Sequence, residues 1–146
     1  MIFLVDIDGT IADPKHRLHF IDTKPADWDG FFQACPDDLP IPEVIEVIRS
    51  LKLAGNHIVL VSGRSDAIKD KTTQWLEDFD VPFDDLYMRK AGDHREDNVV
   101  KAELLHQLSL VWDREQIRGV FEDRQQVVDM YRKEGLRVFQ VAPGNF

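Results

Sequence analysis

The sequence predicts an α/β fold, a three-layer Rossmann-like arrangement in which a parallel sheet of about five strands has helices on both faces. Two features of the chain indicate this class. Short apolar runs alternate with stretches of helical periodicity, and several of the apolar runs end abruptly in acidic or glycine-containing segments. Strands that alternate with helices at this spacing form right-handed βαβ units, so most neighbouring strands should be parallel.

The first predicted strand is the apolar run Ile2–Val5, which has the continuous hydrophobic pattern of a strand buried on both faces. Asp6, Asp8 and Gly9 follow it directly. Both carboxylates can reach the crevice beyond the strand if Gly9 lets the backbone turn away. Charges this close repel each other, which favours a cation between them or a proton on one of them. Taken alone, the segment also fits an ordinary turn rich in Asp and Gly.

Residues 13–42 are predicted to form a short cap insertion after the first strand. The segment contains five prolines, which argue against one long helix. It also carries aromatic side chains that argue against disorder, namely Phe20, Trp28, Phe31 and Phe32. We expect a compact insertion with a helical turn or two around residues 27–34. It forms either a lid over the strand end or a surface segment whose aromatic side chains pack onto the core.

The remaining chain continues the alternation of helices and strands. Apolar strands are predicted at residues 57–61, 85–88, 117–121 and 137–141. Helices are predicted at residues 42–53, 68–79, 98–110 and 125–134, with Gly55 and Gly135 as stop signals and Asn98 as an N-cap. Residues 89–97 are predicted to form a charged loop between a strand and a helix.

The composition fits one globular domain that spans residues 1–146. A net charge of −9 and a pI near 4.9 repel bulk nucleic acid and membrane surfaces, so a polyanionic substrate needs a local cluster of basic residues. Cys35 is the single cysteine and cannot form an intramolecular disulfide. No signal peptide or membrane-spanning run occurs, and we therefore expect a cytoplasmic protein with no membrane partner.

The polar residues that follow the predicted strands should meet at one edge of the sheet, because parallel strands all end there. Asp6 and Asp8 follow the first strand, and Glu122 and Asp123 follow the strand at 117–121. Their carboxylates offer hard oxygen ligands, which suit a magnesium site better than a zinc or copper site. Such concentrated negative charge would otherwise destabilise the fold. We therefore expect Mg²⁺ as the cofactor.

Three further residues are predicted near the same edge. Ser62 and Gly63 follow the strand at 57–61, where a hydroxyl and a backbone N–H can donate to a phosphate oxygen. Lys101 lies near the start of a helix and can both balance the carboxylates and bind a phosphoryl group. A carboxylate nucleophile, a metal, an acid and fixed donors are the parts needed for displacement at phosphorus.

These residues give the chain a resemblance to the phosphatases of the haloacid dehalogenase superfamily. The four ordered motifs of that superfamily match the segment Asp6-Ile7-Asp8-Gly9-Thr10, Ser62, Lys101 and the pair Glu122-Asp123. The resemblance implies that Asp6 is the nucleophile that forms an aspartyl-phosphate and that Asp8 is the general acid and then the general base. It also implies one phosphatase domain over residues 1–146, with residues 13–42 as its small cap.

The resemblance further assigns the ligands of the metal and of the substrate. Mg²⁺ would be held by the Asp6 carboxylate, the Asp8 main-chain carbonyl and Asp123, with Glu122 nearby through water. Ser62 and Lys101 would hold the phosphoryl oxygens as catalytic residues. Two more residues within these motifs are expected to bind the substrate, namely Thr10 and Gly63.

A narrower resemblance covers the C-terminal half, which is similar to the 3′-phosphatase domain of the phage polynucleotide kinase/phosphatase that repairs DNA and RNA ends. The similar segments are residues 61–64, 89–95, 97–101, 122–132 and 140–142. By this resemblance, Arg64 and Arg89 help to bind the substrate phosphate, and Asp97 steadies Lys101. A phage or bacterial origin follows from the resemblance alone.

The chain departs from that repair enzyme in two ways. No Gly-rich loop ending in Gly-Lys-Ser or Gly-Lys-Thr occurs, so we expect phosphate removal without kinase activity, with a separate kinase as a candidate partner. The insertion at residues 13–42 does not match closely, and in this superfamily that region selects the substrate.

Three hypotheses of function follow. The first is a magnesium-dependent phosphomonoesterase that removes 3′-phosphate from DNA or RNA ends, with a phosphorylated nucleic-acid end as its partner. The aromatic insertion and the net acidity also fit a phosphatase of free nucleoside monophosphates. The third hypothesis, a non-catalytic phosphate-binding module, is opposed by the intact pair Asp6 and Asp8.

Overall fold

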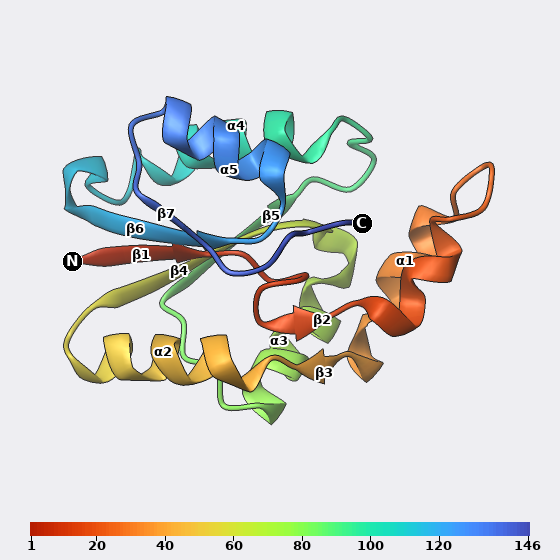
Figure 1. Cartoon of the computed structure of the whole chain (residues 1–146), viewed down its shortest axis with the longest axis horizontal. Coiled ribbons are helices and arrows are strands. Elements are labelled where there is room, and N and C mark those ends of the chain that lie inside the picture. The colour runs from red at the N-terminus through yellow and green to blue at the C-terminus, as the bar shows by residue number, and fades with distance from the viewer.

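A computed structural model of residues 1–146 contains a five-stranded sheet between two layers of helices (Figure 1). The strand order is β5-β4-β1-β6-β7, and every neighbouring pair is parallel. The predicted α/β class, the parallel sheet of five strands and the helices on both faces are therefore confirmed. The strands are β1 (Ile2–Val5), β4 (His57–Ser65), β5 (Asp85–Arg89), β6 (Ile117–Glu122) and β7 (Val138–Gln140).

The two helical layers follow from the alternation of side chains along the central strands. Leu4 and Val59 belong to a core shared with α4 and α5, whereas Val5 and Leu60 belong to a core shared with α2 and α3. Successive residues of a strand point to opposite faces, so an unbroken apolar run fills both cores. The helices are α2 (Pro42–Leu53), α3 (Lys69–Asp78), α4 (Asp97–Leu108) and α5 (Gln125–Lys133).

The insertion leaves the sheet after β1 and returns before α2, and its ends pair as a two-stranded antiparallel ribbon. Figure 1 shows it projecting from one side of the molecule. The predicted helical turn is present, and Asp27 caps it by accepting a hydrogen bond from the Gly30 N–H at 2.9 Å. The elements of the insertion are β2 (Ala12–Asp13), a 3-10 helix (Lys15–Phe20), α1 (Trp28–Gln33), a second 3-10 helix (Cys35–Asp37) and β3 (Leu39–Pro40).

One predicted helix start is wrong. Helix α4 begins at Asp97 with Glu96 as its N-cap, so Asn98 lies inside the first turn, and the Oδ1 of Asn98 is buried without a hydrogen-bond partner. The N-cap therefore lies two residues earlier than predicted, and the carboxylate of Asp97, the first residue of the helix, is bound by Arg89 and Arg124. No helix combines the length and the apolar character that crossing a membrane requires.

Candidate active site

Three acids meet at the carboxyl edge of the sheet. Asp6 follows β1, Glu122 ends the neighbouring strand β6 and Asp123 follows it, so the parallel pairing of these strands brings the side chains together. Their oxygens lie within 4.8 Å of one another, and all three residues are almost fully buried. The cluster thus concentrates negative charge where water cannot screen it.

Lys101 of α4 supplies the positive charge next to this cluster. Its Nζ lies 2.6 Å from the Asp6 Oδ1 and 2.7 Å from the Glu122 Oε2. Burial alone would lower the pKa of Lys101, but the charges of Asp6 and Glu122 outweigh it and raise that pKa well above its usual value. Lys101 is therefore a permanent ammonium group, and it offsets the charge of only one of the three carboxylates.

The acids fit a divalent cation. The Asp123 Oδ2 is buried and has no hydrogen-bond partner. Burial and the charge of Glu122 raise the pKa of Asp123 to about 7, and burial and the same charge also raise the pKa of Asp6. Carboxylate oxygens of this kind suit Mg²⁺. Glu122 is the least available member, because its oxygens already accept hydrogen bonds from Lys101 and from backbone N–H groups.

Thr10 and Gly9 support the cluster from the loop after β1. The Thr10 hydroxyl donates to the Asp6 Oδ2 at 3.0 Å, and Thr10 is completely buried. Gly9 has a φ of +84°, and a side chain there would collide with the carboxylate of Asp123. In this structure Thr10 therefore orients the Asp6 carboxylate, and it does not line the cavity in which we expected it to contact a substrate.

Asp8 faces two arginines from different parts of the chain. Arg64 donates to the Asp8 Oδ1 at 2.7 Å through Nη2, and Arg17 of the insertion binds the same oxygen. Asp38, also from the insertion, accepts from both guanidinium groups. Burial would raise the pKa of Asp8, but the charges of Arg64 and Arg17 lower it to about 2. Asp8 is therefore held as a carboxylate.

The two arginines that were expected to bind phosphate are engaged by protein groups. Arg64 is fully buried and donates to Asp8, Asp38 and Thr72. Arg89 lines the cavity, but it donates to the carboxylate of Asp97 and to backbone carbonyls at the end of β4 and in the charged loop.

The assignment of Arg64 and Arg89 to the substrate phosphate stays a prediction. Arg64 positions Asp8, and Arg89 ties the charged loop to the sheet. Asp97 forms ion pairs with Arg89 and Arg124 and none with Lys101. Its negative charge still adds to those of Asp6 and Glu122 in raising the pKa of Lys101, which is the direction that the predicted steadying of the lysine requires.

The end of β4 contributes Ser62 and Gly63. The Ser62 Oγ is buried and accepts a hydrogen bond from the Arg64 N–H at 3.1 Å. Gly63 lines the cavity, and a side chain there would collide with Asp97. Sequence reasoning missed the roles of Arg17 and Asp38, because no local pattern in the proline-rich insertion marks a buried ion pair.

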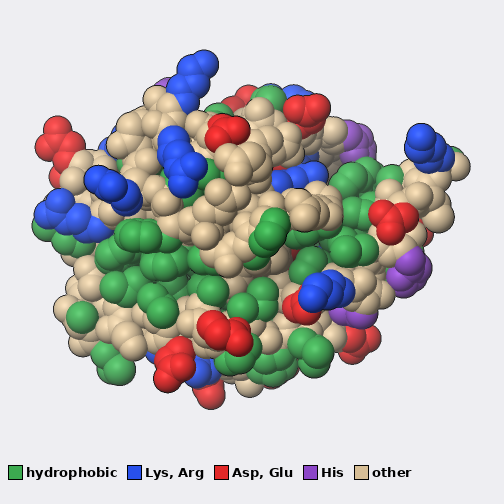
Figure 2. Space-filling view, in the orientation of Figure 1, with side chains coloured by type: hydrophobic (Ala, Val, Ile, Leu, Met, Phe, Trp, Pro, Cys, Tyr) green, Lys and Arg blue, Asp and Glu red, His purple; other side chains and the backbone are tan.

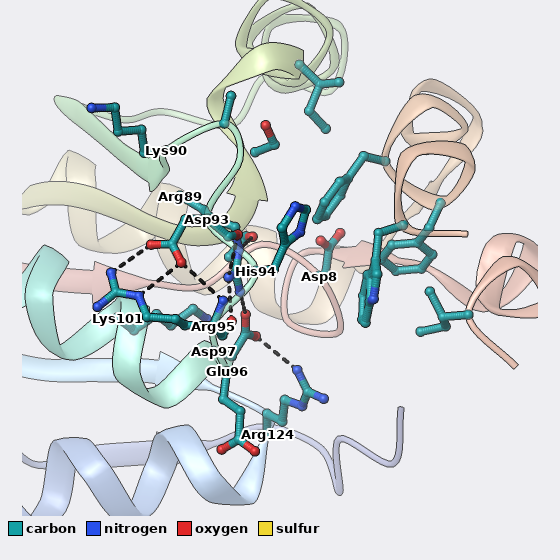
Figure 3. A pocket seen from close by; sticks show the side chains of 18 of the residues that line it. Asp8, Arg89, Lys90, Asp93, His94, Arg95, Glu96, Asp97, Lys101 and Arg124 are labelled. Carbon is teal, nitrogen blue, oxygen red and sulfur yellow. Dashed lines mark hydrogen bonds and ion pairs between the residues drawn. The ribbon is translucent and has the colours of Figure 1, made fainter. Parts of the chain in front are cut away.

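A cavity of about 550 Å³ lies beside the acidic cluster. Asp6, Lys101 and Asp123 line it from the sheet edge, and aromatic side chains of α1 line it from the insertion. Figure 3 shows Asp8 and the charged loop, from Lys90 to Asp97, around the same space. The arrangement can hold a phosphoryl group against Asp6 and leaves room for the group that carries it.

A sequence model of the polynucleotide kinase PNKP phosphatase domain matches residues 1–146. The chain belongs to this family. Membership identifies it as a phosphatase, a hydrolase of phosphoric monoesters, and confirms the resemblance to haloacid dehalogenase phosphatases. A protein of the Autographa californica nuclear polyhedrosis virus, assigned as a bifunctional polynucleotide kinase/RNA ligase, is 31% identical over 134 residues, which are 88% of this chain.

Solved structures agree with this family and fold. A chain of the Pnkp1/Rnl/Hen1 RNA repair complex is 31% identical, with a TM-score of 0.84 over 99% of this chain. The D,D-heptose 1,7-bisphosphate phosphatase from B. bronchiseptica, solved with magnesium and phosphate, shares the fold at 17% identity, with a TM-score of 0.66 over 98% of this chain and 82% of its own. This chain covers 17% of the length of the viral relative and 43% of the RNA repair chain.

Proposed function

We propose that this chain is a Mg²⁺-dependent polynucleotide 3′-phosphatase that works through an aspartyl-phosphate intermediate. The observation that carries the proposal is the buried set of Asp6, Lys101 and Asp123, which lies at one side of a cavity large enough for a nucleotide. The family match over the whole chain supports a polynucleotide substrate. We further propose that the domain acts in the cytoplasm beside a kinase, since the similar viral protein is assigned as a polynucleotide kinase and RNA ligase.

Asp6 is the proposed nucleophile. Lys101 binds its Oδ1 and Thr10 binds its Oδ2, so the carboxylate is fixed before the substrate arrives. One carboxylate oxygen forms a bond to phosphorus, and the bond between phosphorus and the leaving 3′-oxygen breaks. Lys101 offsets charge on the phosphoryl oxygens during this step, and Ser62 and the Gly63 N–H are the proposed donors to the same oxygens.

Asp6 and Asp123 would hold Mg²⁺ through their carboxylates, together with the main-chain carbonyl of Asp8, and Glu122 would lie near it through water. When bound, the ion supplies positive charge for the phosphoryl oxygens. The unpaired Asp123 Oδ2 is the feature that favours this assignment.

Asp8 is the proposed acid and base. It protonates the leaving oxygen and then takes a proton from the water that attacks the aspartyl-phosphate, while the bond between Asp6 and phosphorus breaks. Arg17 and Arg64 favour the charged form of Asp8, with its pKa lowered to about 2, and this suits the base step. The acid step needs a proton on Asp8, so we propose that substrate binding weakens the contacts with the two arginines.

A phosphatase of free nucleoside monophosphates is the second candidate, favoured by the aromatic side chains that the insertion turns toward the cavity. The third, a non-catalytic phosphate-binding module, would have no need of the fixed Asp6 carboxylate. The predicted phage origin stays a prediction.

The test is phosphate release from a 3′-phosphorylated oligonucleotide, its 5′-phosphorylated twin, and 3′- and 5′-mononucleotides. We expect the protein to prefer the 3′-phosphorylated polymer, and we expect phosphate release to stop when a chelator removes Mg²⁺. Preference for a mononucleotide would favour the second candidate, and phosphate binding without any release would favour the third. Asp78→Asn, at an exposed aspartate on α3, is a control variant that should keep full activity.

A further inference from the structure

The cavity is larger than the phosphoryl group needs. Its volume of about 550 Å³ falls in the range of pockets that enclose whole small ligands. The carboxylates and Lys101 line the side formed by the sheet edge. The rest is lined by the insertion, the charged loop, the turn around Ile68 and a few residues near Gln126 and Phe146. The remaining space must receive the part of the substrate that carries the phosphate.

The side formed by the insertion is aromatic. Trp28, Phe31 and Phe32 of α1 all line the cavity, and their spacing places them on one face of the helix. The ring of Trp28 lies 5.8 Å from that of Phe31 at 88°, and 6.1 Å from that of Phe32 at 34°. Figure 2 shows hydrophobic side chains gathered where the insertion meets the rest of the molecule.

The three rings differ in solvent exposure, and this difference indicates which ring packs inside the protein and which rings can contact a ligand. Phe31 is buried, and the guanidinium of Arg17 lies 4.2 Å from the centre of its ring. Trp28 is 44% exposed, and Phe32 is partly exposed. Phe31 therefore fixes α1 against the ion-pair network, while Trp28 and Phe32 keep ring surface open to the cavity.

We infer that Trp28 and Phe32 form a stacking wall for the nucleobase of the nucleotide that carries the scissile phosphate. The inference rests on the proposed function, which sets the phosphoryl group against Asp6. A flat, apolar ring surface beside a phosphate site matches the π-face of a base, and stacking of this kind tolerates every base. Across the cavity, His94 extends from the charged loop toward the insertion and limits the space on the other side of the base (Figure 3).

The decisive comparison uses two substrates that differ only in the terminal base. One is a 3′-phosphorylated oligonucleotide, and the other carries an abasic residue at the phosphorylated end. For Trp28→Ala we expect the KM of the first substrate to rise roughly tenfold to a hundredfold, with kcat and the cleavage of the abasic substrate almost unchanged. Trp28→Phe keeps an aromatic face and should restore most of the affinity. Phe139→Ala is the matched control, since Phe139 is 45% exposed on β7, away from the cavity.

A second measurement reports stacking directly. In the inactive variant Asp6→Asn, the base-bearing oligonucleotide should quench the fluorescence of Trp28, whereas the abasic one should not. If Trp28→Ala raised the KM of both substrates equally, or of neither, the stacking wall would be overturned. The phosphatase assignment would stay intact. If the wild-type protein cleaves mononucleotides but no oligonucleotide, the proposed function fails. The stacking wall is then tested by itself, by comparing the KM of the same variants for mononucleotides that carry a base and for those that lack one.

Discussion

The sheet edge and the insertion build two halves of one site by different physical means. The sheet places Asp6, Glu122 and Asp123 through strands that two apolar cores of 13 and 12 buried residues hold from both faces. Buried ion pairs attach the insertion to the site. Arg17 binds Asp8, and Asp38 binds both Arg17 and Arg64. The nucleophile therefore depends on the fold itself, whereas the acid–base residue depends on how the insertion docks.

This difference has an energetic side. An apolar core tolerates small changes of volume and loses stability in proportion to the surface exposed. A buried ion network loses more when one member is removed, because the remaining charges have neither water nor a partner. Removing one charge from the insertion network should therefore cost more stability than a small change of volume in the two apolar cores.

The largest effect is expected at the sheet edge, in Asp6→Asn. The amide cannot form the acyl phosphate, so kcat should fall at least ~10⁴-fold, which is about 5.5 kcal/mol of transition-state stabilisation. Lys101 keeps its pair with Glu122, so the fold should persist. Phosphate release and trapping of the phosphorylated protein measure the loss. A kcat within tenfold of the wild-type value would show that Asp6 is not the nucleophile.

The next effect is expected in the insertion, in Asp38→Ala. The change leaves Arg17 and Arg64 buried together with Asp8 as their shared carboxylate, and it should lower the free energy of unfolding by about 3–5 kcal/mol. A shift of Asp8 should also lower kcat by roughly 10²-fold. Urea unfolding and kcat measure the two effects, with the exposed Asp37→Ala as the control. If the variant lost stability but kept the wild-type kcat, the insertion would not be needed to position Asp8.

The two halves also differ in how far the sequence could predict them. The meeting of Asp6 with Glu122 and Asp123 was predictable, because parallel strands share an edge and apolar runs mark where the strands end. The network of Arg17 and Asp38 was not, since no periodicity distinguishes a buried ion pair from a solvated charge.

Arg64 and Asn98 illustrate how side-chain competition escapes sequence patterns. The resemblance assigns Arg64 to the substrate phosphate, and in this structure its guanidinium donates to Asp8. Asn98 has the residue type of an N-cap, but α4 begins at Asp97, whose carboxylate pairs with Arg89 and Arg124. For Asn98 the residue type predicted a cap, and the structure places the cap at Glu96. For Arg64 the contacts with Asp8 and Asp38 come from segments far apart in the sequence, which no local pattern reveals.

A smaller effect on stability is expected when acid protonates Asp8, which pairs with Arg17 and Arg64. The folded protein holds the pKa of Asp8 at about 2, below its ordinary value of 3.8, because Arg64 and Arg17 outweigh the effect of burial. A lowered carboxyl pKa gives stability that is present above about pH 4 and lost as the pH falls through 2, and the shift corresponds to about 2 kcal/mol. Asp8→Asn should therefore show a weaker loss of urea stability between pH 6 and pH 2.5 than wild type. The same pH dependence in both proteins would contradict the paired state of Asp8.

The smallest effect is expected for an exposed ion pair of nearly equal length that joins the charged loop to α4. The Arg95 Nη1 lies 2.6 Å from the Glu103 Oε1, close to the 2.7 Å between the Arg17 Nη2 and the Asp38 Oδ2. Arg95 and Glu103 are exposed, however, and water solvates each charge when the other is removed. Glu103→Gln should therefore leave the unfolding midpoint and kcat unchanged within error, at low salt and at high salt. If it cost as much stability as Asp38→Ala, the length of the contact rather than its burial would set the strength, and the contrast between the insertion and the rest of the molecule would lose its physical basis.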